Sequence, residues 1–321
     1  MTPFKFTAVP LAAAILLASA SAHAQSSVTI SGTIDIGMYR DLDHTTHLGP
    51  ISRSNIAFSG VEDLGGGLAA TFKLSHRFDP SNGGNESGTK PFWHGESTVG
   101  LKGGWGSIKF GRALDAISAN DWEFDPWYNF DRIASPAWDL WHYNFPSDPK
   151  ANSGTAEYGR LNNGIFYDSP TFGGFQLHLS GSPQSEAGEP DKALGGSLHY
   201  KNQYFSGMVA HERNAAGNTD NFLGLKSGFG SFGIMGVYDV SKAGASKAKT
   251  TTLGATYAIS NVTLQAGWGQ VNLDGVKAEK MFSLGAVYAL SKRTNVYADF
   301  AHKTFVASSG NTYGVGIAHS F

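Results

Sequence analysis

The chain has 321 residues, with 24 Lys and Arg against 26 Asp and Glu, a formal net charge of −2 and no cysteine. This charge balance gives no indication of a nucleic-acid partner, and the lack of cysteine excludes disulfides and cysteine-based sites. A content of 41 Gly with 12% aromatic residues is unlike a helical protein, and no apolar run after residue 24 approaches the ~18 residues of a membrane-spanning helix.

Residues 1–24 have the layout of an export signal. Lys5 precedes the apolar run LAAAILLASA, and small residues close the segment at Ala22-His23-Ala24, a typical cleavage pattern. The run is shorter than the ~20 residues that a spanning helix needs, so a retained membrane anchor is the weaker interpretation. We therefore predict a signal peptide over 1–24 and a single mature domain over 25–321.

From Val28 onward, apolar residues alternate with polar or small ones, which is the period of a β-strand. The first segment places Val28, Ile30 and Ile34 on one face, with Thr29 and Ser31 on the other. Sixteen such segments lie between turn signals, near 27–40, 51–60, 67–78, 92–102, 105–112, 157–168, 174–182, 192–200, 203–212, 220–227, 231–240, 249–259, 261–271, 280–290, 294–304 and 311–321. The sequence predicts an all-β protein.

The connections between these segments differ in length. Short ones, such as LGGG at 64–67 and KGGWG at 102–106, alternate with longer polar ones, such as DLDHTTHLGP, DPSNGGNESGTK and SKAGAS. An even strand number with short turns at one rim and long loops at the other is typical of an outer-membrane barrel. A secreted β-sandwich or propeller would show the same alternation with its faces reversed, and is the alternative. The preferred interpretation is a 16-stranded antiparallel transmembrane β-barrel, whose bore is wide enough to hold water.

Several stretches resemble the general porins of Gram-negative outer membranes, particularly those of β-proteobacteria. They are SSVTISGTIDIGM, SRSNIAFSGVEDLGGGLAATFKL, GSIKFGR, FYDSPTFGGF, YALSKRTNVYADF and the closing YGVGIAHSF. The resemblance implies a homotrimer in the cell outer membrane, in contact with lipid and lipopolysaccharide, that passes ions and small hydrophilic solutes by passive diffusion. It also implies that the barrel-insertion machinery recognises the terminal Phe321.

Residues 113–157 show no clear strand alternation, and a loop of this length requires a function. In the family that the chain resembles, the third loop folds into the bore and constricts it, and we expect the same here. The segment supplies five carboxylates that could face the bore: Asp115, Asp121, Glu123, Asp125 and Asp131. Four of its indoles are candidate surfaces for solute stacking, although such rings more often anchor a loop: Trp122, Trp127, Trp138 and Trp141.

Five cations are expected on the opposite wall. The alternation directs Arg53, Lys73 and Lys109 to the polar face, and Arg112 and Arg160 match positions where the family carries lumen arginines. Strict alternation would place Arg112 on the other face from Lys109, so its lumen position requires a bulge. Cations that face carboxylates across a constriction would orient dipolar solutes and bias ion passage.

The chain departs from the family just before YDSP, where many relatives have a basic residue and this chain has Phe166. We expect the anion preference to weaken accordingly, and the sequence leaves the sign of ion selectivity open.

No GxSxG, HExxH, P-loop phosphate-binding or dinucleotide motif appears, so we expect no enzyme activity, no cofactor and no metal. Because some outer-membrane barrels are hydrolases with Asp–His pairs at the outer rim, Asp43, His44 and His47 in the first loop are retained as a remote catalytic candidate. The sequence predicts a passive water-filled channel. The alternative is a solute-specific channel, for sugars or aromatic acids, that uses the aromatic third loop.

Overall fold

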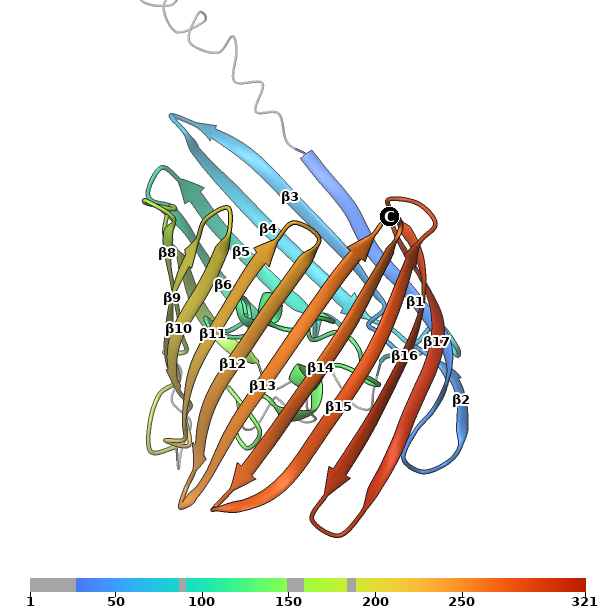
Figure 1. Cartoon of the computed structure of the whole chain (residues 1–321). Coiled ribbons are helices and arrows are strands. Elements are labelled where there is room, and N and C mark those ends of the chain that lie inside the picture. Colours follow the sequence, from blue (N-terminus) through green and yellow to red (C-terminus); the bar gives the residue numbers. More distant parts are fainter. Residues whose placement is uncertain (1–26, 87–90, 149–158, 184–188) are drawn as a thin grey trace, which may run out of the picture.

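The computed structural model describes residues 27–86, 91–148, 159–183 and 189–321. The predicted signal peptide and residues 149–157 of the predicted constriction loop lie outside these ranges. The described residues form one closed antiparallel sheet (Figure 1). Its strands are β1 (Ser27–Arg40), β2 (Thr46–Gly49), β3 (Asn55–Gly65), β4 (Leu68–Arg77), β5 (Glu96–Gly103), β6 (Gly106–Leu114), β7 (Arg160–Asp168), β8 (Phe175–Gly181), β9 (Leu194–Lys201), β10 (Phe205–Arg213), β11 (Thr219–Phe229), β12 (Phe232–Ala243), β13 (Ser246–Ile259), β14 (Val262–Leu273), β15 (Val276–Ala289), β16 (Thr294–Phe305) and β17 (Ser309–Ser320).

The pairing of β1 with both β2 and β3 explains how seventeen strands make a sixteen-stranded barrel. One edge of β1 pairs with β3 over Ser27–Thr33 and with β2 over Gly37–Arg40. The strands β2 and β3 therefore share one strand position of the barrel, which we call the first stave. The other edge pairs with β17 and closes the barrel. Between β2 and β3 the chain leaves the sheet, because the Asp35 carboxylate accepts hydrogen bonds from the backbone N–H groups of Ile51 (2.9 Å) and Ser52 (2.8 Å). We call residues 50–54 the first-stave bulge. The predicted strand number is confirmed.

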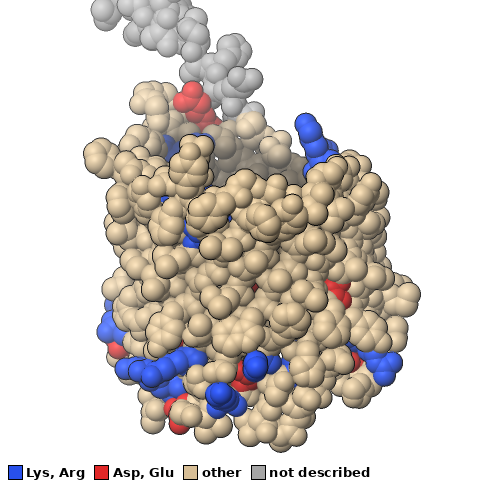
Figure 2. Space-filling model, viewed as in Figure 1, with Lys and Arg blue, Asp and Glu red and all other residues tan. Residues whose placement is uncertain are grey.

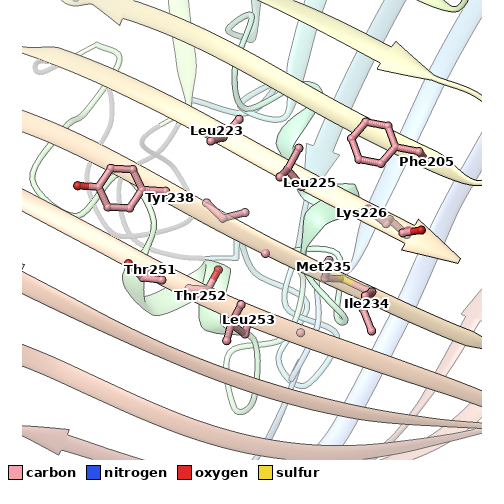
Figure 3. Close-up of a pocket in the computed structure, with 14 residues that line it drawn as sticks. Phe205, Leu223, Leu225, Lys226, Ile234, Met235, Tyr238, Thr251, Thr252 and Leu253 are labelled. Carbon is pink, nitrogen blue, oxygen red and sulfur yellow. The ribbon is translucent and has the colours of Figure 1, made fainter.

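The apolar face of the alternation lies outside. Phe72 and Leu177 are each 38% exposed and Val315 is 55% exposed, whereas Arg53 is only 8% exposed. Figure 2 shows the result on the face in view, a broad uncharged band with Lys, Arg, Asp and Glu gathered mostly towards the lower rim. An apolar groove of about 560 Å³ over β11 to β13 also belongs to this face, since Leu223, Ile234 and other residues that line it are exposed (Figure 3). This exposure is incompatible with a sandwich, which would bury its apolar face.

The rims are less asymmetric than the sequence suggests. Among the described strands, the long connections at the lower rim of Figure 1 all precede β9, at 78–95, 115–159 and 182–193. The prediction of a longer loop at SKAGAS is wrong, since β12 continues to Ala243 and β13 begins at Ser246. Asp274 and Gly275 join β14 to β15 with φ of 51° and 89°, the two positive values that a tight type I′ hairpin turn requires. Long strands thus replace loops in this half of the barrel.

The described part of the third loop, up to residue 148, lies inside the ring of strands (Figure 1). It contains a 3₁₀ helix, η1 (Asp121–Phe124), and a short α-helix, α2 (Pro136–Leu140). Ser135 caps α2 by accepting a hydrogen bond from the backbone N–H of Trp138 at 3.1 Å, and Pro136 occupies its first position. Within the described residues, no helix is long or apolar enough to cross a membrane.

The chain ends at the seam of the barrel. The backbone N–H and C=O of Phe321 exchange hydrogen bonds with those of Gly32 at 3.0 and 3.1 Å, and the residue is 40% exposed. The final aromatic therefore extends the β1–β17 ladder by one pair.

Candidate functional site: the constriction of the bore

The third loop packs against the inner face of β11 to β16, which we call the loop wall. Glycines at inward positions of this wall provide the space. A Cβ added at Gly224 would lie 2.5 Å from the Phe124 ring, and one added at Gly254 would lie 2.6 Å from Pro126. Both distances are far shorter than the ~3.5–4.0 Å of an ordinary carbon contact, so a side chain at either glycine would displace the loop.

Two of the four predicted stacking indoles anchor this loop. Trp127 donates from Nε1 to Asp299 Oδ1 at 2.7 Å, and Trp141 donates from Nε1 to Thr252 Oγ1 at 3.0 Å. Both rings are buried. A buried indole with its N–H satisfied contributes a large apolar area to packing, so these two residues are unavailable for solute stacking.

Four of the five predicted loop carboxylates are buried within the loop and its contacts: Asp115, Asp121, Asp125 and Asp131. Asp125, for example, accepts hydrogen bonds from the backbone N–H groups of Trp127 and Asn129, both at 3.0 Å, and from Ser135 Oγ at 2.9 Å. Burial raises the pKa of Asp125 to about 6, although these hydrogen bonds oppose the shift. Contrary to expectation, these four carboxylates are buried and do not face the bore. Asp115, Asp125 and Asp131 accept hydrogen bonds from backbone N–H groups of the loop, since its turns leave donors that need acceptors, and Asp121 contacts His142 Nε2 at 2.9 Å.

Glu123 is different because it reaches a second cavity of the bore, of about 480 Å³. Its carboxylate lies 2.7 Å from His199 Nε2 and accepts hydrogen bonds from Lys201 Nζ and Ser206 Oγ, both at 3.0 Å. Burial alone would raise the pKa of Glu123, but the hydrogen bonds with His199 and Lys201 lower it to about 2. Glu123 therefore attaches η1 to β9 and β10.

Opposite the loop stands a set of cations that we call the basic wall: Arg53, Lys73, Arg77, Lys109, Arg112 and Arg160. Lys73 and Lys109 share one carboxylate, Glu96 on β5, with Nζ–Oε distances of 2.9 and 3.3 Å. Phe166, at the position where the family resemblance led us to expect a base, is buried beside Lys109, whose Nζ lies 5.6 Å from the ring centroid. The aromatic ring thus supports a neighbouring cation instead of adding one.

The bulge that Arg112 requires is present. The β6–β7 register shifts between Gly111 and Ala113, and Gly111 has a φ of 127° that favours glycine. The Arg112 guanidinium donates to the carbonyl oxygen of His94 at 3.0 Å and to Asn162 Oδ1 at 2.7 Å. Arg112 therefore adds its charge to the basic wall, and its guanidinium joins the segment before β5 to β7.

The basic wall and the loop enclose a cavity of about 360 Å³. Five cations line it: Arg53, Lys73, Arg77, Lys109 and Arg160. Glu96 is the one carboxylate among the described residues of the lining. The loop side is mainly aromatic and includes Trp122, Tyr128 and Phe130, each at least 40% exposed. The fourth predicted indole, Trp138, lies 4.8 Å from the guanidinium carbon of Arg53.

Sequence reasoning missed three charged groups of this region: Arg77, Glu86 and Glu96. Arg77 lies four residues after Lys73, and therefore on the same face of β4. The alternation already indicated that its side chain faces the bore. Glu96 faces Ser75 across the β4–β5 ladder, and that pairing is known only from the structure. Glu86 comes from the second loop, where its Oε2 lies 3.7 Å from Arg77 Nη1, and no periodicity indicates its position.

The first-loop residues do not form a catalytic triad. Thr45 Oγ1 lies 2.6 Å from Asp43 Oδ2 and 2.5 Å from His47 Nε2, and Asp43 Oδ2 lies 3.3 Å from the same nitrogen. A serine-hydrolase type of triad places the acid on one ring nitrogen and the nucleophile on the other. The arrangement is a local hydrogen-bonded turn, and His44 has a positive φ of 63° within it.

Comparisons with known proteins agree with this architecture. The family model for Gram-negative porins matches residues 11–308. Outer membrane porin protein 32 of Delftia acidovorans is 31% identical over 91% of this chain and 88% of its own length, and an outer membrane porin protein of Bordetella pertussis is 27% identical over 97% and 99%. The solved structure of an anion-selective porin from Comamonas acidovorans has a TM-score of 0.79 at 24% identity, covering 92% of this chain and all of that one. The chain belongs to the Gram-negative porin family and forms a channel in the outer membrane.

Proposed function

We propose that this channel passes anions more readily than cations, and that the basic wall determines the preference. One observation carries the proposal: five cations and a single carboxylate line the constriction cavity among its described residues. Because the loop carboxylates expected to balance these cations are buried in hydrogen bonds, the field at the constriction is positive on one side and weakly opposed on the other. The solved neighbour described as anion-selective supports this sign.

The mechanism combines size exclusion with an electrostatic bias. A constriction ringed by cations lowers the energy of an anion and raises that of a cation, and salt screens both effects over a Debye length of about 10 Å at 0.1 M. The arginines keep their charge when crowded together, so the bias persists where lysines could lose protons. No bond is made or broken, and we infer no catalytic role.

The reversal potential of single channels in a KCl gradient tests the proposal. We expect the anion sign for the wild type, and a smaller potential for Lys73→Ala with Lys109→Ala, because two of the five lining cations are removed. Lys249→Ala is the matched control, since Lys249 is exposed next to the buried Ala248 and Thr250 of β13 and lies on the outer face. A wild-type potential of the cation sign, or equal changes in the control, would overturn the proposal.

The packing of the loop aromatics does not favour the alternative of a solute-specific channel, since Trp127 and Trp141 are buried anchors. Added sugars should block the ion current of a solute-specific channel but not that of a general pore, and we expect no block.

We further propose, on the family resemblance, that three copies assemble and that Phe321 is recognised during insertion. The exposed aromatic side chain at the seam supports the second part. Phe321→Ala should reduce the amount of folded protein in the outer membrane while leaving the conductance of the inserted channels unchanged. An unchanged amount would contradict that role.

A further inference from the structure

A compact polar cluster lies beneath the third loop, apart from the basic wall. His142 follows α2 in the loop, Asp220 is on β11 and Asp239 is on β12. His142 Nδ1 lies 2.5 Å from Asp220 Oδ2 and 3.9 Å from Asp239 Oδ2. One donor atom from each residue lies within 4.8 Å of the other two. Three elements distant in sequence thus bring one imidazole and two carboxylates to a single point.

The cluster has more acceptors than donors. Asp220 and Asp239 are each 1% exposed, and neither Oδ1 atom has a hydrogen-bond partner among the described residues. The nearby Asp121 and Glu212 also carry a buried oxygen without a donor there. Four buried carboxylates around one imidazole cannot all be ionised at acceptable cost unless a cation compensates them.

The other ring nitrogen of His142 faces a buried carboxylate, as the nitrogen that does not bind the ion usually does in metal-bound histidines. Its Nε2 lies 2.9 Å from Asp121 Oδ2, and Asp121 is 1% exposed. Metal-bound histidines usually donate their second N–H to a carboxylate, which fixes the tautomer and leaves the inner nitrogen free to bind the ion. Asp121 therefore holds the imidazole so that Nδ1 faces Asp220 and Asp239.

An ion can reach this position from the bore. His142 is among the residues that line the constriction cavity, and its ring is only slightly exposed there. The water of the channel therefore meets the cluster at the imidazole, while the carboxylates lie behind it.

We propose that His142, Asp220 and Asp239 bind a divalent metal ion that fastens the third loop to β11 and β12. One nitrogen and two carboxylate oxygens without sulfur suit Zn²⁺ or Mn²⁺ better than Ca²⁺ or Mg²⁺, which prefer oxygen alone. In the absence of the ion a proton on Nδ1 bridges to Asp220, and binding of the ion releases that proton. The ion would join the third loop, which narrows the bore, to strands β11 and β12. It would thereby fix the width of the constriction.

The test uses the full mature chain folded in detergent, first stripped with a chelator and then dialysed against Zn²⁺. We expect one equivalent of Zn²⁺ per chain by metal analysis, release of protons on binding, and slower protease cleavage of the third loop in the loaded form. Asp220→Asn combined with Asp239→Asn should lower the affinity by more than about tenfold, and Asp121→Asn by about 10- to 100-fold.

Asp299→Asn is the matched control, since Asp299 is a buried carboxylate of the same wall that accepts from Trp127 and lies outside the cluster. It should retain the equivalent of Zn²⁺. Absence of bound Zn²⁺ and Mn²⁺ from the wild type would overturn the proposal and show that shared protons neutralise the carboxylates. Equal binding by the Asp220 and Asp239 variant would also overturn it. If that variant fails to fold, the wild-type metal analysis still decides, and ion selectivity is independent of either result.

Discussion

The two sides of the constriction use charge in opposite ways. On the basic wall, Lys73 and Lys109 remain 47% and 31% exposed to the bore while sharing Glu96. On the loop side, Asp125 and Asp131 are 2% and 5% exposed and accept backbone hydrogen bonds. Charges of the first kind act on passing ions, whereas those of the second kind stabilise the loop that shapes the passage.

This difference follows from the backbone of each side. A β-strand satisfies its own N–H and C=O groups in the ladder, so side chains on its inner face are free to project into water. An irregular loop has no ladder, and its N–H groups take acceptors from nearby side chains. Carboxylates on the loop are therefore the first groups to be withdrawn from the bore.

The largest expected effect comes from separating the two sides physically. Gly254→Val places methyl groups where Pro126 now lies, so the third loop must shift into the bore or detach from the wall. Single-channel conductance should change severalfold in either direction. Gly228→Val is the control, because a Cβ there would come no closer than 3.7 Å to Phe232 O. Equal conductance in wild type and Gly254→Val would contradict packing of the loop on a glycine surface.

Removal of Glu96 sharpens the contrast between the two sides. Glu96→Gln deletes the lining carboxylate that Lys73 and Lys109 share, and should increase the anion-to-cation permeability ratio by about threefold, equivalent to ~0.7 kcal/mol. Reversal potentials in a salt gradient measure this ratio. A decrease in the ratio would mean that Glu96 serves chiefly to hold the two lysines in the bore.

A smaller effect is expected at low pH through Glu123. Its pKa is lowered to about 2 in the folded loop, so its contribution is present above the unfolded value of 4.5 and is lost as pH falls towards 2. Protease cleavage of the third loop should accelerate over that window in the wild type. Glu123→Gln should show faster cleavage at neutral pH and a flatter dependence below 4.5. A wild-type profile without change there would contradict attachment through Glu123.

The smallest expected effect is the pH dependence due to Asp125, whose pKa shift has the opposite sign to that of Glu123. Burial raises its pKa to about 6, so folding of the loop favours the protonated form and this contribution is lost as pH rises from about 3.8 to about 6. Asp125→Asn keeps an acceptor oxygen and should remove that part of the pH dependence from loop protection, measured by hydrogen exchange. Identical profiles for wild type and variant would show that Asp125 does not titrate in this range.

Much of the barrel could be predicted because strand alternation is a local property. Phe72, Leu177 and Val315 alternate with polar or small neighbours in the printed sequence, and all three are exposed on the outer face. The need for a bulge at Arg112 also followed from counting residues after Lys109. The first-stave bulge did not, because its cause is a pair of hydrogen bonds from the backbone of Ile51 and Ser52, outside the strands, to the Asp35 side chain of β1.

The site was harder to predict for the same reason. Arg77 shared a face with Lys73 and was within reach of the pattern, whereas Glu96 needed the β4–β5 register. The burial of Asp115, Asp125 and Asp131 depended on how the loop coils upon itself, and nothing in their spacing indicates which backbone groups they accept from.

The sequence by itself determined the strand period, the two faces of each strand and the position of the long third loop, because each follows from the order of polar and apolar residues along one segment. Tertiary structure decided which charges face the bore, which glycines receive the loop, and that His142 meets Asp220 and Asp239. These depend on contacts between segments far apart in the chain. Only closure of the sheet brings such segments together.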